Sequence, residues 1–213
     1  MSRLTFAETK ACCHLAYGAV RGESYRLSDG SIWHILNSWA TRISGFKAIQ
    51  LHPSGDGDRM VLAFAGTDSI RDGLADVAQV VGVLPIQYHQ ALALTNSCWG
   101  LHPDLHLCGH SLGGGLAAYS SVETRVPAST INPAPLVAAA GISAIFGNHS
   151  QIVNYIAGGS EVVSSSPGRN PGRSVSVPGV GNFVTRHFLA NTDPSVSLPV
   201  KLVLETGVPP SYA

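Results

Sequence analysis

The sequence predicts an α/β fold, with a mostly parallel central sheet, helices on both faces, and residues 1–213 in a single domain. The main observation is that short apolar runs typical of strands alternate with segments whose apolar residues recur at helical spacing. One strand passes through a glycine-rich turn directly into a helix of small residues, as in sheets covered by helices. The chain of 213 residues is also long enough for a substantial core.

The first hundred residues predict two strands among four helices. Residues 4–17 place apolar and small side chains at helical spacing and are followed by Gly18 and Gly22. Residues 31–38 predict a second, short helix. Residues 46–51 and 60–65 predict strands joined by the turn-forming segment 53–58, hence a hairpin. Residues 69–82 and 86–99 predict two more helices, with Pro85 between them.

The second half continues the alternation and then changes character. A short buried strand over 105–108 leads through glycines into a small-residue helix over 115–122. A strand over 129–132, a helix over 136–146 and a strand over 151–157 follow. After Gly158 and Gly159 the chain is rich in loops, including SSSPGRNPGRS at 164–174.

The composition argues against a nucleic-acid partner and is compatible with a lipid surface. Hydrophobic residues make up 45% of the chain and charged residues 12%, and the 13 basic residues balance the 13 acidic ones. This charge gives no electrostatic case for nucleic acid, whereas a surface so poor in charge tolerates a lipid interface. The cysteines at 12, 13, 98 and 108 form neither a disulfide framework nor a zinc pattern, and we expect reduced thiols.

The amino-terminal residues do not resemble a signal peptide, because no basic region precedes an unbroken apolar run. No later stretch is long enough to predict a transmembrane helix. We therefore expect a chain that is cytoplasmic as synthesised and that reaches the exterior, if at all, through a non-classical or specialised secretion system.

The strand-to-helix turn carries the strongest functional signal. Gly109 to Gly113 fit G-x-S-x-G, a pattern that exposes the central serine on a strained turn. The glycines two before and two after remove Cβ atoms that would otherwise collide. Ser111 is the predicted nucleophile, and the N–H of Leu112 at the helix start is the predicted donor to an oxyanion. The alternative is a glycine-rich loop with an incidental serine.

A serine nucleophile needs a base, and the base needs an acid to orient it. In α/β-hydrolases these partners follow the serine in the order acid, then histidine. Beyond Ser111 the carboxylates are Glu123, Glu161, Asp193 and Glu205, and the histidines are His149 and His187. Glu123 lies on the helix after the nucleophile, and Asp193 and Glu205 follow both histidines. The predicted triad is therefore Ser111, Glu161 and His187.

Each partner also has a plainer interpretation. Glu161 is alternatively a surface acid, and His187 a histidine packed beside Phe188. We expect His149, which precedes the acid, at the surface. The histidines at 102, 106 and 110 are clustered, but Pro103 and the strand pattern break any helical ligand spacing, so we expect no metal site.

These residues resemble the class 3 lipases, α/β-hydrolases that include fungal triacylglycerol lipases and bacterial phospholipases. The most specific segments are VLAFAGTDSI at 61–70, with Asp76 further on, and LCGHSLGG at 107–114. Looser similarity extends over 130–133, 153–157, 161–163 and 186–187. The resemblance covers most of the chain.

The resemblance implies further site residues. Thr67 would be the second oxyanion donor, through its backbone and hydroxyl. A helical lid would begin near Ser69, which makes Ile70 and Leu74 candidates for acyl-chain contact. Two departures stand out: Ala65 replaces the usual arginine, and Glu161 replaces the usual aspartate.

The leading hypothesis is a serine hydrolase that cleaves carboxylic esters of lipids through an acyl-enzyme, without metal or organic cofactor. The enzyme would act at a membrane or micelle surface, as a phospholipase A or lysophospholipase on phospholipids, or as an acylglycerol lipase on neutral lipids. Arg169 and Arg173 lie between Glu161 and His187 and favour a phosphate-bearing head group, the alternative being solvated loop residues.

Two other hypotheses remain. The first is a hydrolase-like scaffold that binds a partner or lipid with little or no turnover, in line with Ala65 and Glu161. The other concerns biological role: an exported bacterial lipase toxin neutralised by an immunity protein. The oligomeric state is not indicated by the sequence.

Overall fold

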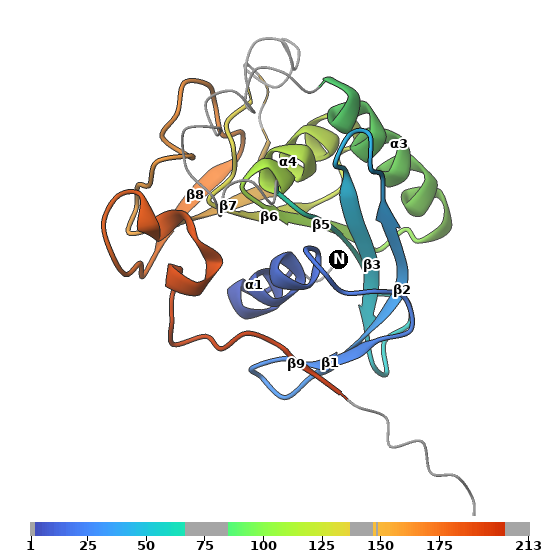
Figure 1. Ribbon diagram of the computed structural model, residues 1–213. Coiled ribbons are helices and arrows are strands. Elements are labelled where there is room, and N and C mark those ends of the chain that lie inside the picture. Colours follow the sequence, from blue (N-terminus) through green and yellow to red (C-terminus); the bar gives the residue numbers. More distant parts are fainter. Residues whose placement is uncertain (1–2, 67–84, 137–146, 148, 203–213) are drawn as a thin grey trace, which may run out of the picture.

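The computed structural model describes residues 3–66, 85–136, 147 and 149–202. Its centre is one nine-stranded sheet of order β8-β7-β6-β5-β4-β3-β2-β1-β9 within these residues (Figure 1). The strands are β1 Ser24–Arg26, β2 Ile32–Ala40, β3 Lys47–Pro53, β4 Met60–Phe64, β5 Leu105–His110, β6 Ala128–Ile131, β7 Ile152–Ala157, β8 Arg173–Val177 and β9 Val200–Lys201.

The sheet has two halves of different character. Strands β4 to β8 pair in parallel. Strands β9, β1, β2, β3 and β4 pair antiparallel. Because parallel strands end on the same side, the residues after β4 to β8 meet along one edge, here called the carboxyl edge. The opposite edge, where β4 to β8 begin, is called the amino edge.

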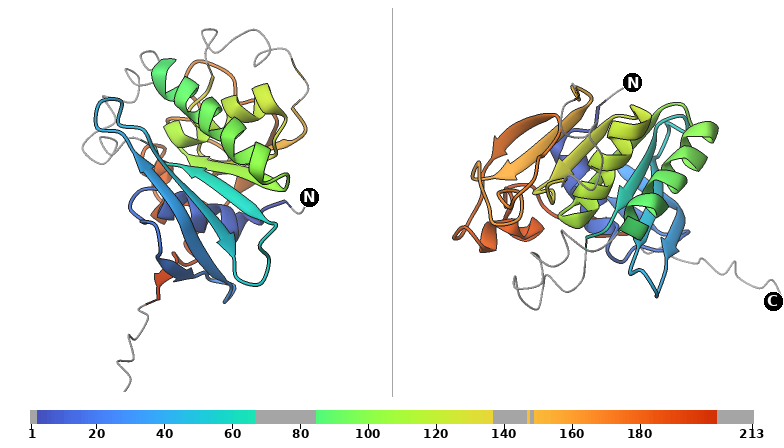
Figure 2. Two further views of the ribbon diagram at one scale, coloured as in Figure 1. Left: turned by 90° about the vertical axis from the view of Figure 1, so that its right-hand side faces the viewer. Right: turned by 90° about the horizontal axis from the view of Figure 1, so that it is seen from above.

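Helices cover both faces of the sheet, as the sequence predicts (Figures 1 and 2). Helix α1, Phe6–Leu15, lies on one face, and α3, Pro85–Leu101, and α4, Leu112–Thr124, lie on the other. Two short 3-10 helices follow β8, η4 at Thr185–His187 and η5 at Leu189–Asn191. This arrangement is that of an α/β-hydrolase.

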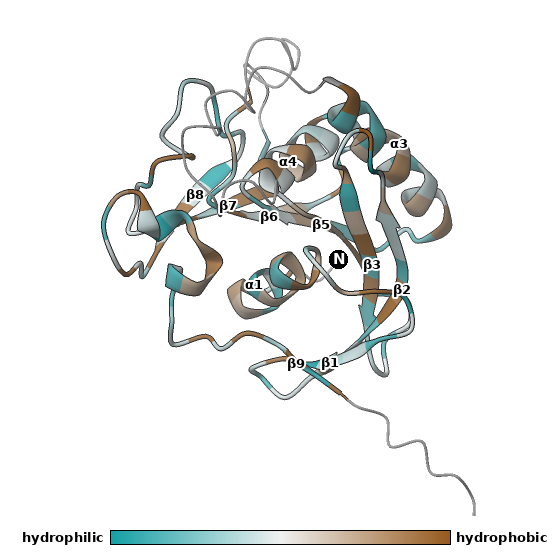
Figure 3. Ribbon diagram, in the orientation of Figure 1, coloured by the Kyte–Doolittle hydropathy of each residue, from teal (hydrophilic) through white to brown (hydrophobic). Residues whose placement is uncertain are grey.

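Successive residues of β4 explain why both faces are apolar. Val61 and Ala63 face α1, and Leu62 and Phe64 face α3 and α4, with exposed fractions of 0%. A strand buried on both faces has no polar side, so its sequence is continuously apolar. Figure 3 shows hydrophobic residues concentrated on the central strands.

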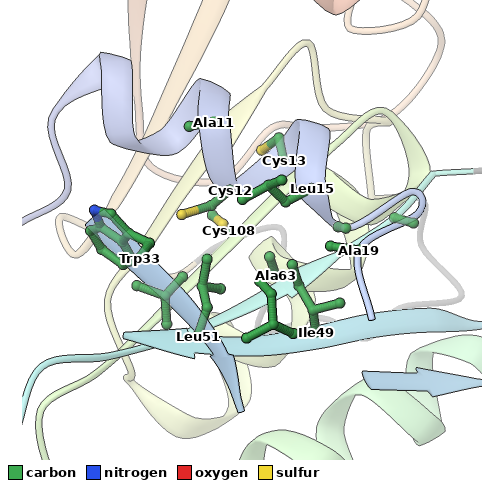
Figure 4. Packing of buried hydrophobic residues seen from close by; sticks show 14 of the residues in the cluster. Ala11, Cys12, Cys13, Leu15, Ala19, Trp33, Ile49, Leu51, Ala63 and Cys108 are labelled. Carbon is green, nitrogen blue, oxygen red and sulfur yellow. The ribbon is translucent and has the colours of Figure 1, made fainter. Parts of the chain in front are cut away.

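Helix α1 is held to the sheet by packing and by polar contacts. Cys12 and Leu15 pack on β3, β4 and β5, where Cys12 lies beside Cys108 (Figure 4). All four cysteines are buried free thiols. Thr5 and Glu8 form a capping box at the start of the helix. The same Glu8 carboxylate accepts two hydrogen bonds from Arg59, 2.8 and 3.0 Å long.

Most predicted elements are confirmed, but one is wrong. The segment predicted as a helix over 31–38 is strand β2. Its register shifts between Ile35 and Asn37 against β3, so that Leu36 is the extra residue of a β-bulge. The bulge interrupts the two-residue alternation and leaves apolar residues at 32, 33, 35 and 36, a spacing that also fits a helix.

Other differences lie in the second half of the chain. His149, expected at the surface, is buried. The loop-rich region contains strand β8, which begins within the predicted loop. The predicted helices over 69–82 and 136–146 fall, apart from Leu136, outside the described residues. No helix within the described residues has both the length and the apolar character needed to cross a membrane.

Candidate active site

Ser111 lies on a strained turn between β5 and α4. Its backbone angles, φ 58° and ψ −126°, are unfavourable for a residue with a side chain. A Cβ atom at Gly109 would overlap the backbone of Gly113, and one at Gly113 would overlap the carbonyl of Phe64. The two glycines therefore permit the tight approach of α4 to β4 and β5, as the motif predicts.

The structure brings Glu161 and His187 together across 26 residues of sequence. Glu161 follows β7 and the two glycines at 158 and 159, both at positive φ, and His187 ends η4. The Nδ1 of His187 lies 2.8 Å from Oε2 of Glu161, and both side chains are 0% exposed. The Glu161 carboxylate also accepts the N–H groups of Val163 at 2.9 Å and Ser164 at 2.5 Å.

These contacts define the protonation of the pair. Burial raises the pKa of the Glu161 carboxyl, but hydrogen bonds from His187 and from residues 163 and 164 outweigh burial and hold it below its ordinary value. An ionised carboxylate only accepts, so Nδ1 of His187 carries the proton. In the neutral ring with this tautomer, Nε2 has a free lone pair, the state required of a general base.

Among the buried side-chain atoms that have no hydrogen-bond partner within the described part of the chain are Oγ of Ser111 and Nε2 of His187. Buried polar groups are rarely left unpaired, and the exceptions concentrate where chemistry requires them. These two atoms are the ones that a serine–histidine pair would join.

His110, the residue before Ser111, holds the backbone of His187. Its Nε2 lies 2.7 Å from the carbonyl oxygen of His187, and its Nδ1 lies 2.8 Å from the hydroxyl of Tyr17. Burial and the neighbouring His187 lower the pKa of His110 to about 3, so the ring is neutral at ordinary pH. A carbonyl only accepts, so Nε2 carries the hydrogen and Nδ1 accepts from Tyr17.

Asn132, at the end of β6, is a second brace on the same carbonyl. Its Nδ2 donates to the carbonyls of Arg186 at 3.0 Å and His187 at 3.1 Å. Its Oδ1 accepts the N–H of Ala157, at the end of β7, at 2.9 Å. Asn132 adopts φ 44°, a left-handed conformation that asparagine tolerates better than most residues. In the sequence, neither Tyr17 nor Asn132 stands out as a site residue, and His110 suggests at most a metal ligand.

Of the two predicted oxyanion donors, Leu112 lies within the described residues and Thr67 does not. Leu112 is the first residue of α4, where backbone N–H groups have no partner within the helix. Thr67, Ile70 and Leu74 lie outside the described residues. Gly66 lies against the nucleophile turn, since a Cβ there would be 3.0 Å from the carbonyl of His110 and 3.2 Å from Cβ of Ser111.

The two candidate head-group residues lie in different places, and both are exposed. The backbone of Arg169 pairs with that of Leu136, a few residues beyond the carboxyl end of β6. Arg173 begins β8 beside Val153, at the amino edge. Four residues of strand, about 13 Å, separate Arg173 from the carboxyl end of β8. The head-group contact stays a prediction, and this placement favours Arg169 over Arg173.

Glu123 and His106, both named in the sequence analysis, have other surroundings. Glu123 is exposed near the end of α4. His106 is buried and contacts the hydroxyl of Ser129 at 3.0 Å. Within the described residues no group of three or more His, Cys, Asp or Glu side chains is arranged to hold a metal ion.

Comparisons with known proteins identify a family for the chain. The model of the Tle-like phospholipase domain matches residues 26–155, more than half of the chain. An extracellular phospholipase A1 of Serratia liquefaciens is 41% identical over 100 residues, which are 42% of this chain and 31% of that protein. The match therefore spans about a third of the relative's length.

Two solved structures share the fold at low sequence identity. A triacylglycerol lipase from Penicillium expansum has a TM-score of 0.53 and 12% identity, covering 91% of this chain and 80% of its own. A triacylglycerol lipase whose catalytic centre is described as a serine-protease triad has a TM-score of 0.51 and 16% identity, covering 77% and 76%.

Proposed function

The chain belongs to the Tle-like phospholipase domain family, and from this premise we propose that it is a serine esterase that hydrolyses carboxylic ester bonds of lipids. Ser111 is the nucleophile, His187 the general base and acid, and Glu161 the group that orients His187. Leu112, with Thr67, holds the oxyanion. The reaction proceeds through an acyl-enzyme on Ser111.

In the first half-reaction, Oγ of Ser111 attacks the ester carbonyl carbon while Nε2 of His187 removes the hydroxyl proton. The carbonyl oxygen becomes an oxyanion and accepts the N–H of Leu112 at the start of α4, where the helix dipole favours negative charge. The imidazolium of His187 is stabilised by Glu161, 2.8 Å from Nδ1. Collapse of the intermediate breaks the ester bond, and His187 returns the proton to the departing alcohol.

In the second half-reaction, water attacks the acyl-enzyme. His187 removes a proton from the water, a second oxyanion forms at the same donors, and collapse releases the fatty acid. The proton returns to Oγ of Ser111, so the site is regenerated without a cofactor.

One observation carries the proposal above the others. Ser111, Glu161 and His187 follow β5, follow β7 and end η4, yet all three are 0% exposed. His187 contacts Glu161 directly, and its carbonyl is hydrogen-bonded to His110, the neighbour of Ser111. Within the described residues, Oγ of Ser111 and Nε2 of His187 have no hydrogen-bond partner. A catalytic role explains both, because these are the two atoms between which the proton would move.

A serine-reactive fluorophosphonate tests the nucleophile directly. We expect the probe to label Ser111 on the intact protein, identified by peptide mass spectrometry, and to inhibit hydrolysis of a chromogenic butyrate ester in proportion to labelling. Ser111→Ala should abolish both. Labelling elsewhere, or hydrolysis that survives Ser111→Ala, would contradict the proposal. Labelling without hydrolysis would favour the alternative, a scaffold with little or no turnover.

The comparisons favour phospholipids over neutral lipids. Both the family description and the Serratia relative are phospholipases, and the relative is an A1 enzyme. We therefore propose cleavage at the sn-1 ester of a diacyl phospholipid, with the exposed Arg169 as a candidate head-group contact. A phosphatidylcholine with different chains at sn-1 and sn-2 tests this: mass spectrometry of the released fatty acid should show the sn-1 chain first.

The biological role stays a hypothesis. The Serratia relative is extracellular, which supports export of this chain. If it is a toxin held by an immunity protein, directing it to the periplasm of a bacterial host should cause lysis that Ser111→Ala prevents. Equal growth of both strains would count against this role.

A further inference from the structure

We propose that the carboxyl edge docks on a phospholipid surface through two exposed apolar patches, one on each side of α4. The hairpin patch consists of Ile43 and Ile86, and the histidine-loop patch consists of Val180, Phe183 and Val184. The inference rests on the proposed function, because a lipid surface is the occupant only if Ser111 cleaves lipids. It adds where the protein contacts that surface.

The hairpin patch is presented by an ordered turn. Ile43, at the tip of the β2–β3 hairpin, is 101% exposed, and Ile86, in the first turn of α3, is 52% exposed. The tip is closed by a 2.9 Å hydrogen bond from the N–H of Gly45 to the carbonyl of Thr41. Ser44 then links hairpin to helix, donating to Gln90 at 2.8 Å and accepting from Gln87 through its carbonyl. The two isoleucines therefore project from one joined unit.

The histidine-loop patch is ordered in a similar way. Val180, Phe183 and Val184 are 56%, 47% and 37% exposed. The side chain of Asn182 accepts the N–H groups of Val184 at 3.0 Å and Thr185 at 2.9 Å. The carbonyl of Phe183 accepts the N–H of Val162 at 3.1 Å, which ties this loop to the one that carries Glu161. The patch thus lies in the segment that leads into His187.

Strand register places both patches at the carboxyl edge. Ala48, near the start of β3, pairs with Phe64 at the carboxyl end of β4, so the hairpin tip lies at that edge. The histidine loop, residues 180–187, lies at the same edge, because Phe183 is hydrogen-bonded to Val162 in the segment that follows β7. Figure 1 shows the hairpin tip and the histidine loop on opposite sides of α4, and the right-hand view of Figure 2 shows both on the same side of the molecule.

The charges of the described residues agree with this orientation. The exposed carboxylates of the described residues, namely Asp29, Asp56, Asp58 and Glu123, all lie in the turns and helix end at the amino edge, alongside the exposed arginines 26, 125 and 173. At the carboxyl edge the exposed Arg42 precedes Ile43 on the hairpin tip. A phosphate layer would repel carboxylates, so the edge that carries the patches, where no described carboxylate is exposed, is the one suited to face lipid.

Binding to phosphatidylcholine vesicles tests the proposal, because their zero net charge leaves apolar insertion as the main driving force. The measurement uses the full chain with Ser111→Ala, which prevents hydrolysis, and compares two double variants, Ile43→Ser with Ile86→Ser and Val180→Ser with Phe183→Ser. Each should lower the partition coefficient by about tenfold or more, given the free energy of burying large apolar side chains. Thermal unfolding checks that each variant is folded.

Leu101→Ser is the matched control. Leu101 is 77% exposed, more than four of the five patch residues, and ends α3 at the opposite edge. We expect it to change partitioning less than twofold. Unchanged partitioning in both double variants, or an equal loss in Leu101→Ser, would overturn the docking surface.

The same experiment separates this inference from the proposed function. If the protein with Ser111 intact hydrolyses a soluble ester but the two double variants bind vesicles normally, the docking surface is wrong and the proposed esterase activity is supported. If the patches control binding but no ester is cleaved, docking stands and the proposed esterase activity fails.

Discussion

The carboxylate of Glu161 is one methylene longer than the aspartate usual among similar lipases, and two backbone N–H groups hold it beside His187. Glu161→Gln should lower kcat by up to about 10⁴-fold, because an amide stabilises neither the needed tautomer nor the imidazolium. Ser111→Ala and His187→Ala should each cost as much or more, since such residues fail as a unit. Initial rates on a chromogenic ester give these values. Full activity in Glu161→Gln would mean that another acid orients His187.

His110 should act as a positioning residue. His110→Phe keeps a buried ring but removes the donor to the His187 carbonyl, so kcat should fall by roughly 10- to 100-fold, the loss expected for one buried hydrogen bond. KM should change little, because the substrate does not contact this ring.

The conservative variant His110→Gln, which keeps a side-chain donor, should recover part of kcat. A purely structural role would instead lower the melting temperature of His110→Phe while leaving kcat of the folded fraction unchanged. Steady-state kinetics and a melting curve on the same samples distinguish the two outcomes.

Two buried histidines should make stability depend on pH. Burial lowers the pKa of His106 to about 4, and burial together with His187 lowers that of His110 to about 3. The unfolded chain titrates near pH 6.5, so between about pH 6.5 and 4 unfolding takes up protons that the folded state does not bind. The two neutral histidines contribute their full stabilisation above pH 6.5. As pH falls through this range, each lowers the free energy of unfolding by about 1.4 kcal/mol per pH unit.

Urea unfolding at pH 7, 6 and 5 measures the slope of the free energy of unfolding against pH. These values lie above the pH range in which carboxylates titrate. His106→Gln, which can still contact Ser129, should make the slope shallower. A free energy of unfolding that is unchanged from pH 7 to 5 would show that these histidines are protonated in the folded state.

At the scale of elements, the junction of β4, β5 and α4 depends on the absence of side chains. Gly113→Ala would drive a methyl group into the carbonyl of Phe64, and α4 would have to move away from the strand. We expect a loss of at least about 2 kcal/mol in the free energy of unfolding, as for other overpacked cores. Gly57→Ala is the matched control, because a Cβ at Gly57 meets no atom within 4 Å. Equal stability of the two variants, by urea unfolding, would contradict this account of the turn.

At the scale of the whole molecule, a fully buried Ser111 must become accessible to a substrate that resides in aggregates. Activity should therefore rise steeply when a short-chain phosphatidylcholine passes its critical micelle concentration, because a lipid surface can bury apolar side chains that water cannot. Ile70→Ser with Leu74→Ser, in the segment expected to form a lid, should blunt that rise more than it lowers hydrolysis of a soluble ester.

Rates on either side of the micelle threshold, with a melting curve, check this prediction. If the double variant loses thermal stability and both activities together, residues 70 and 74 belong to a helix packed permanently on the sheet.

The sequence alone determined the features whose cause is local. The strained turn at Ser111 follows from steric contacts within a few residues, so the glycines of the motif are sufficient to predict it. Strands β3 to β7 and the helices α1, α3 and α4 follow from apolar periodicity. The pairing of Glu161 with His187 was predictable for a different reason: few carboxylates and histidines follow Ser111, and chain order excludes all but one of each.

Only the tertiary structure decided what depends on partners distant in sequence. The bulge at Leu36 made β2 resemble a helix, and only its pairing with β1 and β3 identifies a strand. The hydrogen bonds of His110 and Asn132 to the carbonyl of His187 span 77 and 55 residues, and no local pattern encodes them. The direction of β8 placed Arg173 at the amino edge, whereas its position in the sequence suggested the site. Strand direction and side-chain partners arise from packing across the whole sheet, so they emerge only when the chain is folded.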